Sequence, residues 1–252
     1  MDYSLADKTA LVTGGSRGIG RAAALELAKA GADVAIASRK IDDLEEVAAE
    51  IKRLGRRAFA VSGHIGRMED IKELVDKVTN EFGRIDILVN NAGNSPAVAG
   101  ILEVEERLWD NIMRLNLKGL FFISQAVARV MSEHGGGRIV NIASMSGIRP
   151  EKGASIYSIS KAGVVMLTKS MALELAQYNI RVNAIAPGMI MTRMAQARFD
   201  SFGDKDIVLA KTPLGRIGEP GDVAHAILYL VSDISGFMTG DVLILDGGLL
   251  LT

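Results

Sequence analysis

The sequence predicts a single α/β domain in which helices cover both faces of a doubly wound parallel sheet. Short apolar runs alternate with longer segments of helical periodicity, as is typical of right-handed βαβ units. A glycine-rich stretch directly follows the first apolar run, at the strand end where such sheets bind ligands. No linker, repeat or charge run divides the 252 residues, so we expect one domain over residues 1–252.

The elements follow from these patterns in order. The first strand, 10–13, is an apolar, β-branched run, and the first helix follows from apolar residues at helical spacing from Ile19 to Ala28. The same alternation continues to the C-terminal end. The predicted strands are 10–13, 33–37, 58–61, 87–90, 138–142, 181–185 and 242–245, and the predicted helices are 18–31, 41–54, 68–82, 105–134, 155–178 and 220–232.

Composition excludes several classes of protein. The formal net charge is −1, so no surface for nucleic acid or an anionic membrane is indicated. The chain has no cysteine, and its three histidines are not at metal-ligand spacing, so we expect neither disulfides nor a metal site. No apolar run is as long as a membrane span, and no signal-peptide pattern is visible, so we expect a cytoplasmic protein.

The glycine-rich turn is a candidate phosphate-binding site. A strand, a glycine turn and a helix in this order allow the backbone to approach a pyrophosphate closely, and the helix N-terminus then offers free N–H groups to it. The spacing is Gly-x-x-x-Gly-x-Gly. The residues expected to contact a dinucleotide here are Gly14, Ser16, Arg17, Gly18, Ile19 and Gly20.

A tyrosine and a lysine lie four residues apart on the predicted helix 155–178. Tyr157 and Lys161 should share one face of that helix, so a phenol would lie beside an ammonium. A nearby cation is expected to lower the phenol pKa from its usual value of about 10 and make it a usable acid or base. With the hydroxyl of Ser144, this pair suits reduction of a carbonyl or oxidation of an alcohol.

These motifs together resemble the short-chain dehydrogenase/reductase family over nearly the whole chain. The matching segments are Thr13–Gly20, Asn90–Gly93, Asn116, Ser144, Tyr157, Lys161 and Pro187–Thr192. The resemblance implies a Rossmann fold, with Asn116, Ser144, Tyr157 and Lys161 as catalytic residues. It implies that Lys161 also holds the nicotinamide ribose and that Asn116 holds a water for proton return. It further implies cofactor contacts by Asn90, Ala92, Gly93, Tyr157, Lys161, Pro187, Gly188, Ile190 and Thr192.

The end of the second predicted strand favours NADP(H) over NAD(H). A carboxylate at this position would bind the ribose hydroxyls of NAD, but the sequence here is Ser38-Arg39-Lys40. Arg39 and Arg17 could instead bind a 2′-phosphate. After the third predicted strand, His64 stands where many family members have an aspartate. It is either a hydrogen-bonding substitute for that aspartate or a residue without a role. The backbone of Ile65 should still reach the adenine.

Two further expectations concern loops and assembly. Residues 94–104 and 188–214 should be loops, and the second, a long and weakly structured insert, should act as a lid rather than an ordinary surface loop. The helices 105–134 and 155–178 and the tail ending in Leu249-Leu250-Leu251 carry more apolar residues than one buried face requires. We therefore expect a homo-oligomer, specifically a homotetramer.

The expected function is NADPH-dependent reduction of a ketone or a 3-oxoacyl carbonyl to a secondary alcohol, with Tyr157 as proton donor. The family's 3-oxoacyl-carrier-protein reductases and broader carbonyl reductases are both candidates. A carrier-protein partner would need a basic patch, for which Arg129, Arg149 and Lys152 are available, although Glu151 interrupts it. The alternatives are an NADP-dependent alcohol or sugar dehydrogenase and, more remotely, a dinucleotide-sensing protein without catalysis.

Overall fold

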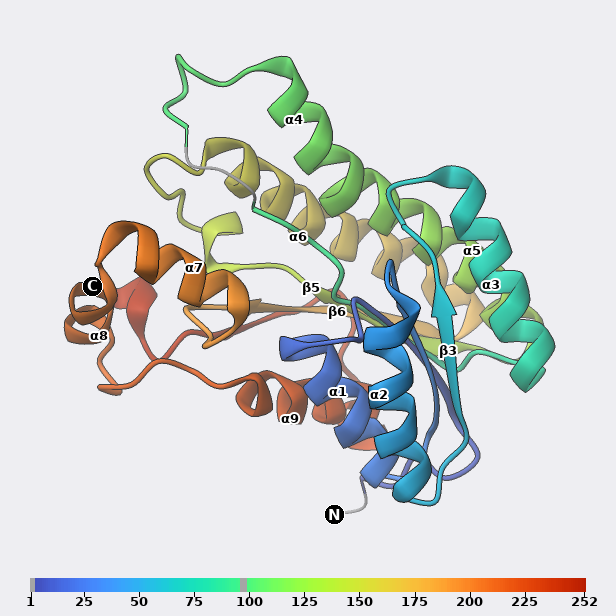
Figure 1. Cartoon of the computed structure of the whole chain (residues 1–252). Helices are drawn as coiled ribbons and strands as arrows, with labels where there is room; N and C mark the ends of the chain where they lie inside the picture. Colours follow the sequence, from blue (N-terminus) through green and yellow to red (C-terminus); the bar gives the residue numbers. More distant parts are fainter. Residues whose placement is uncertain (1–2, 96–98) are drawn as a thin grey trace.

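The computed structural model describes residues 3–95 and 99–252. Within these residues, seven strands form one parallel sheet in the order β3-β2-β1-β4-β5-β6-β7 (Figure 1). The strands are β1 (Thr9–Thr13), β2 (Asp33–Ser38), β3 (Ala58–Ser62), β4 (Ile87–Asn90), β5 (Gly137–Ile142), β6 (Ile180–Pro187) and β7 (Val242–Leu245). All seven predicted strands and the doubly wound Rossmann architecture are confirmed.

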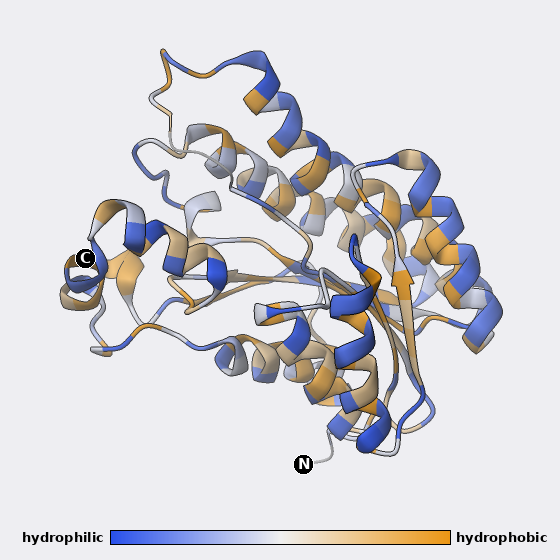
Figure 2. Cartoon of the chain, viewed as in Figure 1, coloured by the Kyte–Doolittle hydropathy of each residue, from blue (hydrophilic) through white to orange (hydrophobic). Residues whose placement is uncertain are grey.

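Helices cover both faces of the sheet (Figure 1). One face packs against α1 (Gly18–Lys29), α2 (Ile41–Arg53) and α9 (Pro220–Val231). The other packs against α3 (Met68–Phe82), α5 (Leu120–Glu133) and α6 (Ser155–Leu175). Apolar residues gather along the strands and the helix sides that meet them, while the outer helix sides are hydrophilic (Figure 2). The central strands β1 and β4 are buried along their whole length, as expected for a sheet that is covered on both faces.

The predicted single helix 105–134 is interrupted by a π-helical segment. It consists of α4 (Glu106–Met113), the π segment Arg114–Gly119 and α5. Apolar periodicity does not reveal the extra residue of a π turn, which is why the sequence predicted one helix. Such segments are often found at functional sites, and this one contains Asn116.

The prediction of a weakly structured loop over 188–214 is wrong, because this segment contains α7 (Arg193–Phe202) and α8 (Lys205–Lys211). Side-chain bonds fix both helices: Thr192 caps α7, and Arg198 of α7 pairs with Asp204 just before α8. The sequence is polar and mixed here, so helical periodicity was weak. Residues 96–98 of the predicted loop 94–104 lie outside the described residues.

The strand order reverses between β1 and β4, which makes this the topological switch point. Dinucleotides bind outside the carboxyl ends of the strands at such a point. The glycine turn after β1, the segment after β4 and the loop after β5 meet at this carboxyl edge. The amino ends of the same strands form the opposite edge of the sheet.

Candidate active site

The glycine turn after β1 is shaped by contacts that leave no room for side chains. Gly14 has φ +65°, in the region that favours glycine. A Cβ on Gly20 would lie 2.2 Å from the carbonyl oxygen of Gly14, so the first turn of α1 packs directly on the loop. Gly18, with φ +54°, faces the Thr192 methyl group, to which a Cβ would approach within 3.3 Å. The turn is thus a backbone cradle, as a pyrophosphate requires.

Two residues that sequence reasoning did not assign to the site hold this turn in place. The Thr13 hydroxyl accepts hydrogen bonds from the backbone N–H groups of Asn91 and Ala92, both at 3.1 Å. The Asn91 amide donates to the carbonyls of Thr13 and Gly14 at 3.0 and 3.1 Å. These bonds tie the ends of β1 and β4 together. Thr13 and Asn91 lie within the segments Thr13–Gly20 and Asn90–Gly93. A polar side chain next to the glycines was the sequence feature that could have identified them.

The segment after β6 reaches the glycine turn from the other side. Gly188 packs on the backbone of Asp246, where a Cβ would lie 2.8 Å from Cα. Ile190 pairs with Gly218 in a parallel bridge, and Pro187 ends β6. Thr192 accepts a hydrogen bond from Ala195 N–H and so starts α7 beside Gly18. The structure therefore brings the predicted cofactor segment Pro187–Thr192 beside the glycine turn of Thr13–Gly20.

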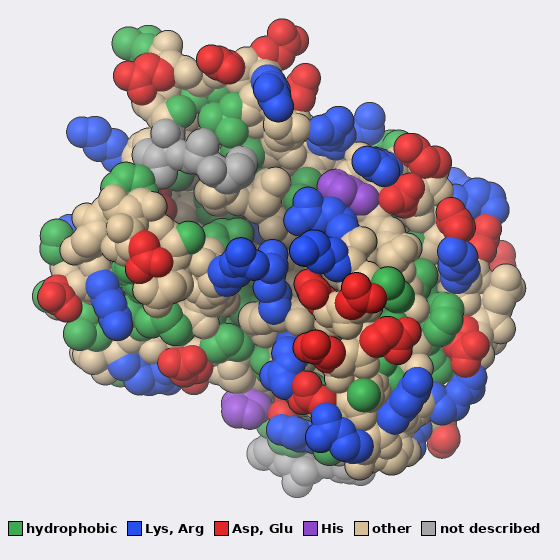
Figure 3. Space-filling model, viewed as in Figure 1, with side chains coloured by type: hydrophobic (Ala, Val, Ile, Leu, Met, Phe, Trp, Pro, Cys, Tyr) green, Lys and Arg blue, Asp and Glu red, His purple; other side chains and the backbone are tan. Residues whose placement is uncertain are grey.

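The ends of β2 and β3 carry the residues expected to select the cofactor. Arg17 and Arg39 are exposed, and the Ser38 hydroxyl donates to the Lys40 carbonyl at 3.3 Å. On the same face as the glycine turn, Lys and Arg side chains gather around a hollow in the molecular surface (Figure 3). Ser16 and Ile19 are half-buried within the turn.

His64 is built into the loop after β3. Its Nδ1 accepts from Gly66 N–H at 2.9 Å, and the backbone N–H of His64 donates to the Asp70 carboxylate at 2.8 Å. Burial, and then the nearby Arg39 charge, lowers the pKa of the imidazole. The structure therefore favours a neutral, hydrogen-bonding His64. Ile65 is buried, and its carbonyl faces Gly119, where a Cβ would lie 2.2 Å from it.

The catalytic candidates meet between β5 and α6. Ser144 begins the turn after β5, and its Oγ accepts from Ser146 N–H at 3.1 Å. A Cβ on Gly147 would lie 2.6 Å from the backbone carbon of Lys161, so this glycine lets the Ser144 turn rest directly on α6. The Ser144 side chain lies close enough to Tyr157 to lower the pKa of its phenol. Serine and tyrosine thus present two hydroxyls to one point.

Lys161 lies beside them but points toward the sheet. Its Nζ donates to the Ile142 carbonyl at 2.7 Å and lies 5.8 Å from the centre of the Tyr157 ring. The side chain is 5% exposed, and burial lowers the pKa of Lys161 to about 8. A Cβ on Gly93 would lie 3.6 Å from Nζ, so Gly93 leaves the space in front of the ammonium open.

The expectation that Lys161 lowers the tyrosine pKa is wrong for this structure. Burial raises the pKa of Tyr157 above its usual value, and the Glu151 charge acts in the same direction, while the Ser144 hydrogen bond opposes both. The ammonium is bonded to the Ile142 carbonyl instead of facing the phenol oxygen. Desolvation of the phenolate therefore outweighs the attraction of the nearby cation.

Asn116 and Asn90 sit in two separate buried networks. The Asn116 amide accepts from Asn94 N–H and donates to the Asn94 carbonyl, both at 2.9 Å, and reaches Ser160 at 3.2 Å. This amide is thus committed to protein partners. Asn90 donates to Ser124 at 2.7 Å and to Asn141 at 2.9 Å, while its Oδ1 is buried without a partner. Asn90 therefore joins β4, β5 and α5 beneath the site.

A salt-bridge network links α7 to the catalytic turn. Arg198 of α7 pairs with Glu151, which follows that turn, and with Asp204 at 2.9 Å. The Ser146 hydroxyl also contacts Glu151 at 3.4 Å. Both carboxylates raise the pKa of the Arg198 guanidinium despite the opposing effect of burial. Arg198 therefore connects α7 and α8 to the loop that carries Ser144.

Residues 3–95 and 99–252 contain no helix long and apolar enough to cross a membrane. They also contain no group of three or more His, Cys, Asp or Glu side chains placed to hold a metal ion.

Comparisons with known proteins identify the family of this chain. The family model described as Enoyl-(Acyl carrier protein) reductase matches residues 14–250. The 3-oxoacyl-[acyl-carrier-protein] reductase FabG of Staphylococcus epidermidis is 40% identical over 245 residues, which cover 96% of this chain and 99% of that protein. Dehydrogenase/reductase SDR family member 4 of Caenorhabditis elegans is also 40% identical over 245 residues, covering 96% and 94%. The solved 7α-hydroxysteroid dehydrogenase complexed with NADH and 7-oxo glycochenodeoxycholic acid matches with a TM-score of 0.94 at 34% identity, covering 98% and 96%.

The chain therefore belongs to the short-chain dehydrogenase/reductase family. It is an oxidoreductase that acts on CH–OH and C=O groups with a nicotinamide dinucleotide. The glycine cradle, which side chains would fill, and the open space before Lys161 fit such a cofactor.

Proposed function

We propose that this enzyme reduces a ketone or a 3-oxoacyl carbonyl to a secondary alcohol with NADPH. The observation that carries the proposal is the convergence of Ser144, Tyr157 and Lys161 beside the glycine cradle. A bound nicotinamide dinucleotide supplies the hydride. The residues of the chain bind and orient both reactants and handle the proton.

Tyr157 is the proposed proton donor. Its raised pKa keeps the phenol protonated at neutral pH, as an acid for carbonyl reduction must be. Ser144 donates a hydrogen bond to the same carbonyl oxygen as negative charge develops there. Lys161 retains two N–H groups after its bond to Ile142, and these suit ribose hydroxyls. Because the Asn116 amide is used by Asn94 and Ser160, a water for proton return would bind its backbone carbonyl.

NADPH is the proposed cofactor because Arg17 in the glycine turn and Arg39 after β2 are both exposed and could bind a 2′-phosphate. No carboxylate ends β2 to repel that phosphate. A neutral His64 beside Arg39 adds no charge that would oppose it. The similar 7α-hydroxysteroid dehydrogenase was solved with NADH, so steady-state kinetics with NADPH and with NADH is the test of this proposal.

A lipophilic carbonyl compound is the proposed substrate. Apolar side chains, including Val104, Leu108 and Ile156, line a crevice beside Tyr157 that measures about 10 Å³, so they give Tyr157 apolar surroundings without forming a substrate-sized pocket. Of the cations considered for a carrier-protein contact, Arg149 donates to the carbonyls of residues 249, 250 and 252 and is therefore engaged by the tail. Apolar walls favour a ketone or acyl chain over a sugar.

The α7–α8 segment is the proposed lid over this substrate site. It begins at Thr192, beside the glycine turn, and Arg198 ties it to Glu151 near Ser144.

Homotetramer formation is also proposed. Its support is a set of apolar side chains exposed on α5 and α6: Phe121, Phe122, Ile159, Met166 and Leu173.

A rate panel tests the proposed reaction. Purified enzyme with NADPH should reduce diketones, aromatic ketones or a 3-oxoacyl thioester faster than NADP⁺ drives oxidation of sugars. The Tyr157→Phe variant should lose more than about 99% of that rate while still binding NADPH, because only the proton donor is removed. Faster sugar oxidation would favour the alternative dehydrogenase, and dinucleotide binding without turnover of any substrate would favour a sensor. Retention of more than a few per cent of the rate by Tyr157→Phe would overturn the assigned acid.

A further inference from the structure

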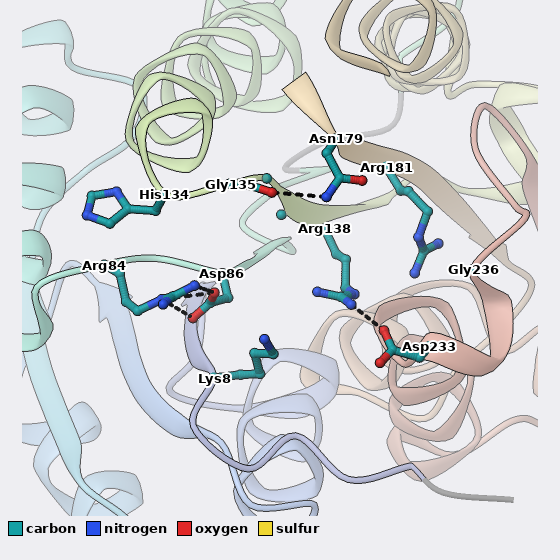
Figure 4. Close-up of a pocket in the computed structure, with 12 residues that line it drawn as sticks. Lys8, Arg84, Asp86, His134, Gly135, Arg138, Asn179, Arg181, Asp233 and Gly236 are labelled. Carbon is teal, nitrogen blue, oxygen red and sulfur yellow. Dashed lines mark hydrogen bonds and ion pairs between the residues drawn. The ribbon is translucent and has the colours of Figure 1, made fainter. Parts of the chain in front are cut away.

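A second pocket lies at the amino edge of the sheet, on the side opposite the active site. It is a hollow of about 370 Å³, and Figure 4 shows the residues that line it. Lys8 precedes β1, Asp86 precedes β4, Arg138 lies in β5 and Arg181 lies in β6. Four neighbouring strands thus each bring one charged residue to the same edge.

Positive charge dominates this pocket. Its cations are Lys8, Arg84, Arg138 and Arg181, against the carboxylates Asp86 and Asp233. Asp86 is already saturated, because it accepts from Thr9 N–H at 2.9 Å and from two nitrogens of Arg84. Asp233 pairs with Arg138 but is 88% exposed, so water weakens that pair. The two remaining cations face the pocket without a carboxylate partner.

Arg138 and Arg181 are direct neighbours across the β5–β6 pairing. Like charges at such positions destabilise a sheet. Burial and then the Arg138 charge lower the pKa of Arg181. Arg181 donates to the carbonyls of Leu230, Ser232 and Met238, which satisfies its hydrogen bonds but supplies no full negative charge.

Two donors remain available in the pocket. The Arg138 Nε is buried and has no hydrogen-bond partner among the described residues. The half-buried Lys8 side chain has no hydrogen bond or ion pair within residues 3–95 and 99–252. In Figure 4 the side chains of Lys8, Arg138 and Arg181 point into one space from three different segments. An unpartnered buried donor and an unpaired ammonium together describe a site built for an anion.

We propose that this amino-edge pocket binds a small oxyanion with at least two negative charges, such as a phosphate or a polycarboxylate. Two charges match the excess of cations over carboxylates among the lining residues. The hollow of about 370 Å³ is large enough for a phosphate or an anion of citrate size together with bridging waters. Binding offsets the repulsion between the guanidinium groups and satisfies the free donors, so it stabilises the folded chain.

Isothermal titration calorimetry and thermal unfolding test this site. The protein is first saturated with NADP⁺ or NAD⁺, whichever binds, so that phosphate cannot occupy the dinucleotide site. Inorganic phosphate and citrate are then titrated separately against sodium chloride of equal ionic strength. We expect saturable binding of at least one oxyanion and a rise in Tm that chloride does not give. The two arms distinguish phosphate from carboxylate recognition.

Variants locate the binding. Lys8→Gln removes no existing bond and should weaken oxyanion affinity at least about tenfold, as loss of a charge-assisted contact does. Arg138→Gln should weaken it further. Lys72→Gln is the matched control, because it removes the same charge from the exposed surface of α3, and its affinity should equal that of the wild type. Unchanged affinity in Lys8→Gln, or equal stabilisation by chloride, would overturn the proposal whether or not any ketone is reduced.

Discussion

The Lys161→Met variant isolates the free energy of keeping an ammonium in the protein core. Lys161 is 5% exposed and donates a hydrogen bond to the Ile142 carbonyl, and among residues 3–95 and 99–252 it forms no ion pair. Methionine has a similar length and no charge. The substitution therefore removes the buried charge while it preserves most of the packing.

The magnitude follows from the pKa. Burial lowers the pKa of Lys161 from 10.5 to about 8, which corresponds to about 3 kcal/mol against folding at pH 7. Between pH 8 and 10.5 the unfolded chain binds a proton that the folded chain has released, so the free energy of unfolding of the wild type rises with pH. At pH 7 the methionine variant avoids this cost, which raises its free energy of unfolding. It also leaves the Ile142 carbonyl without a donor, which lowers the free energy of unfolding by about 1–3 kcal/mol. The net change at neutral pH should be small.

The informative quantity is the change in this difference with pH. Urea unfolding is measured without cofactor at pH 7.0 and 9.5 and at one protein concentration. The stability advantage of Lys161→Met should fall by about 2 kcal/mol between these values, because only the wild type recovers stability by losing a proton. Lys169→Met on the exposed side of α6 is the control, and its difference from the wild type should not follow this trend. Parallel curves for the wild type and Lys161→Met would refute the reasoning.

Three further predictions concern cofactor, lid and assembly. Arg39→Asp should reduce the NADPH-to-NADH ratio of kcat/KM by on the order of a hundredfold, because it exchanges an attraction to the 2′-phosphate for a repulsion; an unchanged ratio in steady-state assays would contradict this. Arg198→Gln breaks both ion pairs of α7, so kcat/KM for the ketone should fall about tenfold while the Kd for NADPH is unchanged. The exposed Arg193→Gln serves as its control, and equal effects of the two would exclude a specific role of Arg198. Light scattering at micromolar concentration should give about four times the chain mass of 26.9 kDa, and a single species at the chain mass would refute the tetramer.

The sequence by itself determined the order of strands and helices along the chain and the candidate catalytic groups. Apolar runs such as 87–90 predicted buried strands, and the glycines at 14, 18 and 20 predicted a tight backbone turn. Tyr157 and Lys161 share a face because a helix repeats every 3.6 residues. These features are local, so spacing along the chain was enough to find them.

Tertiary structure decided what depends on distant segments. The π segment around Asn116 forms where Gly119 packs under the Ile65 carbonyl, a contact that no periodicity encodes. The direction of the Tyr157 pKa depends on burial beneath other elements, so helical adjacency to Lys161 gave the wrong sign. The amino-edge pocket exists only because strand register sets Arg138 beside Arg181, residues far apart in sequence. Electrostatics and burial are sums over neighbours in space, and only the folded chain defines those neighbours.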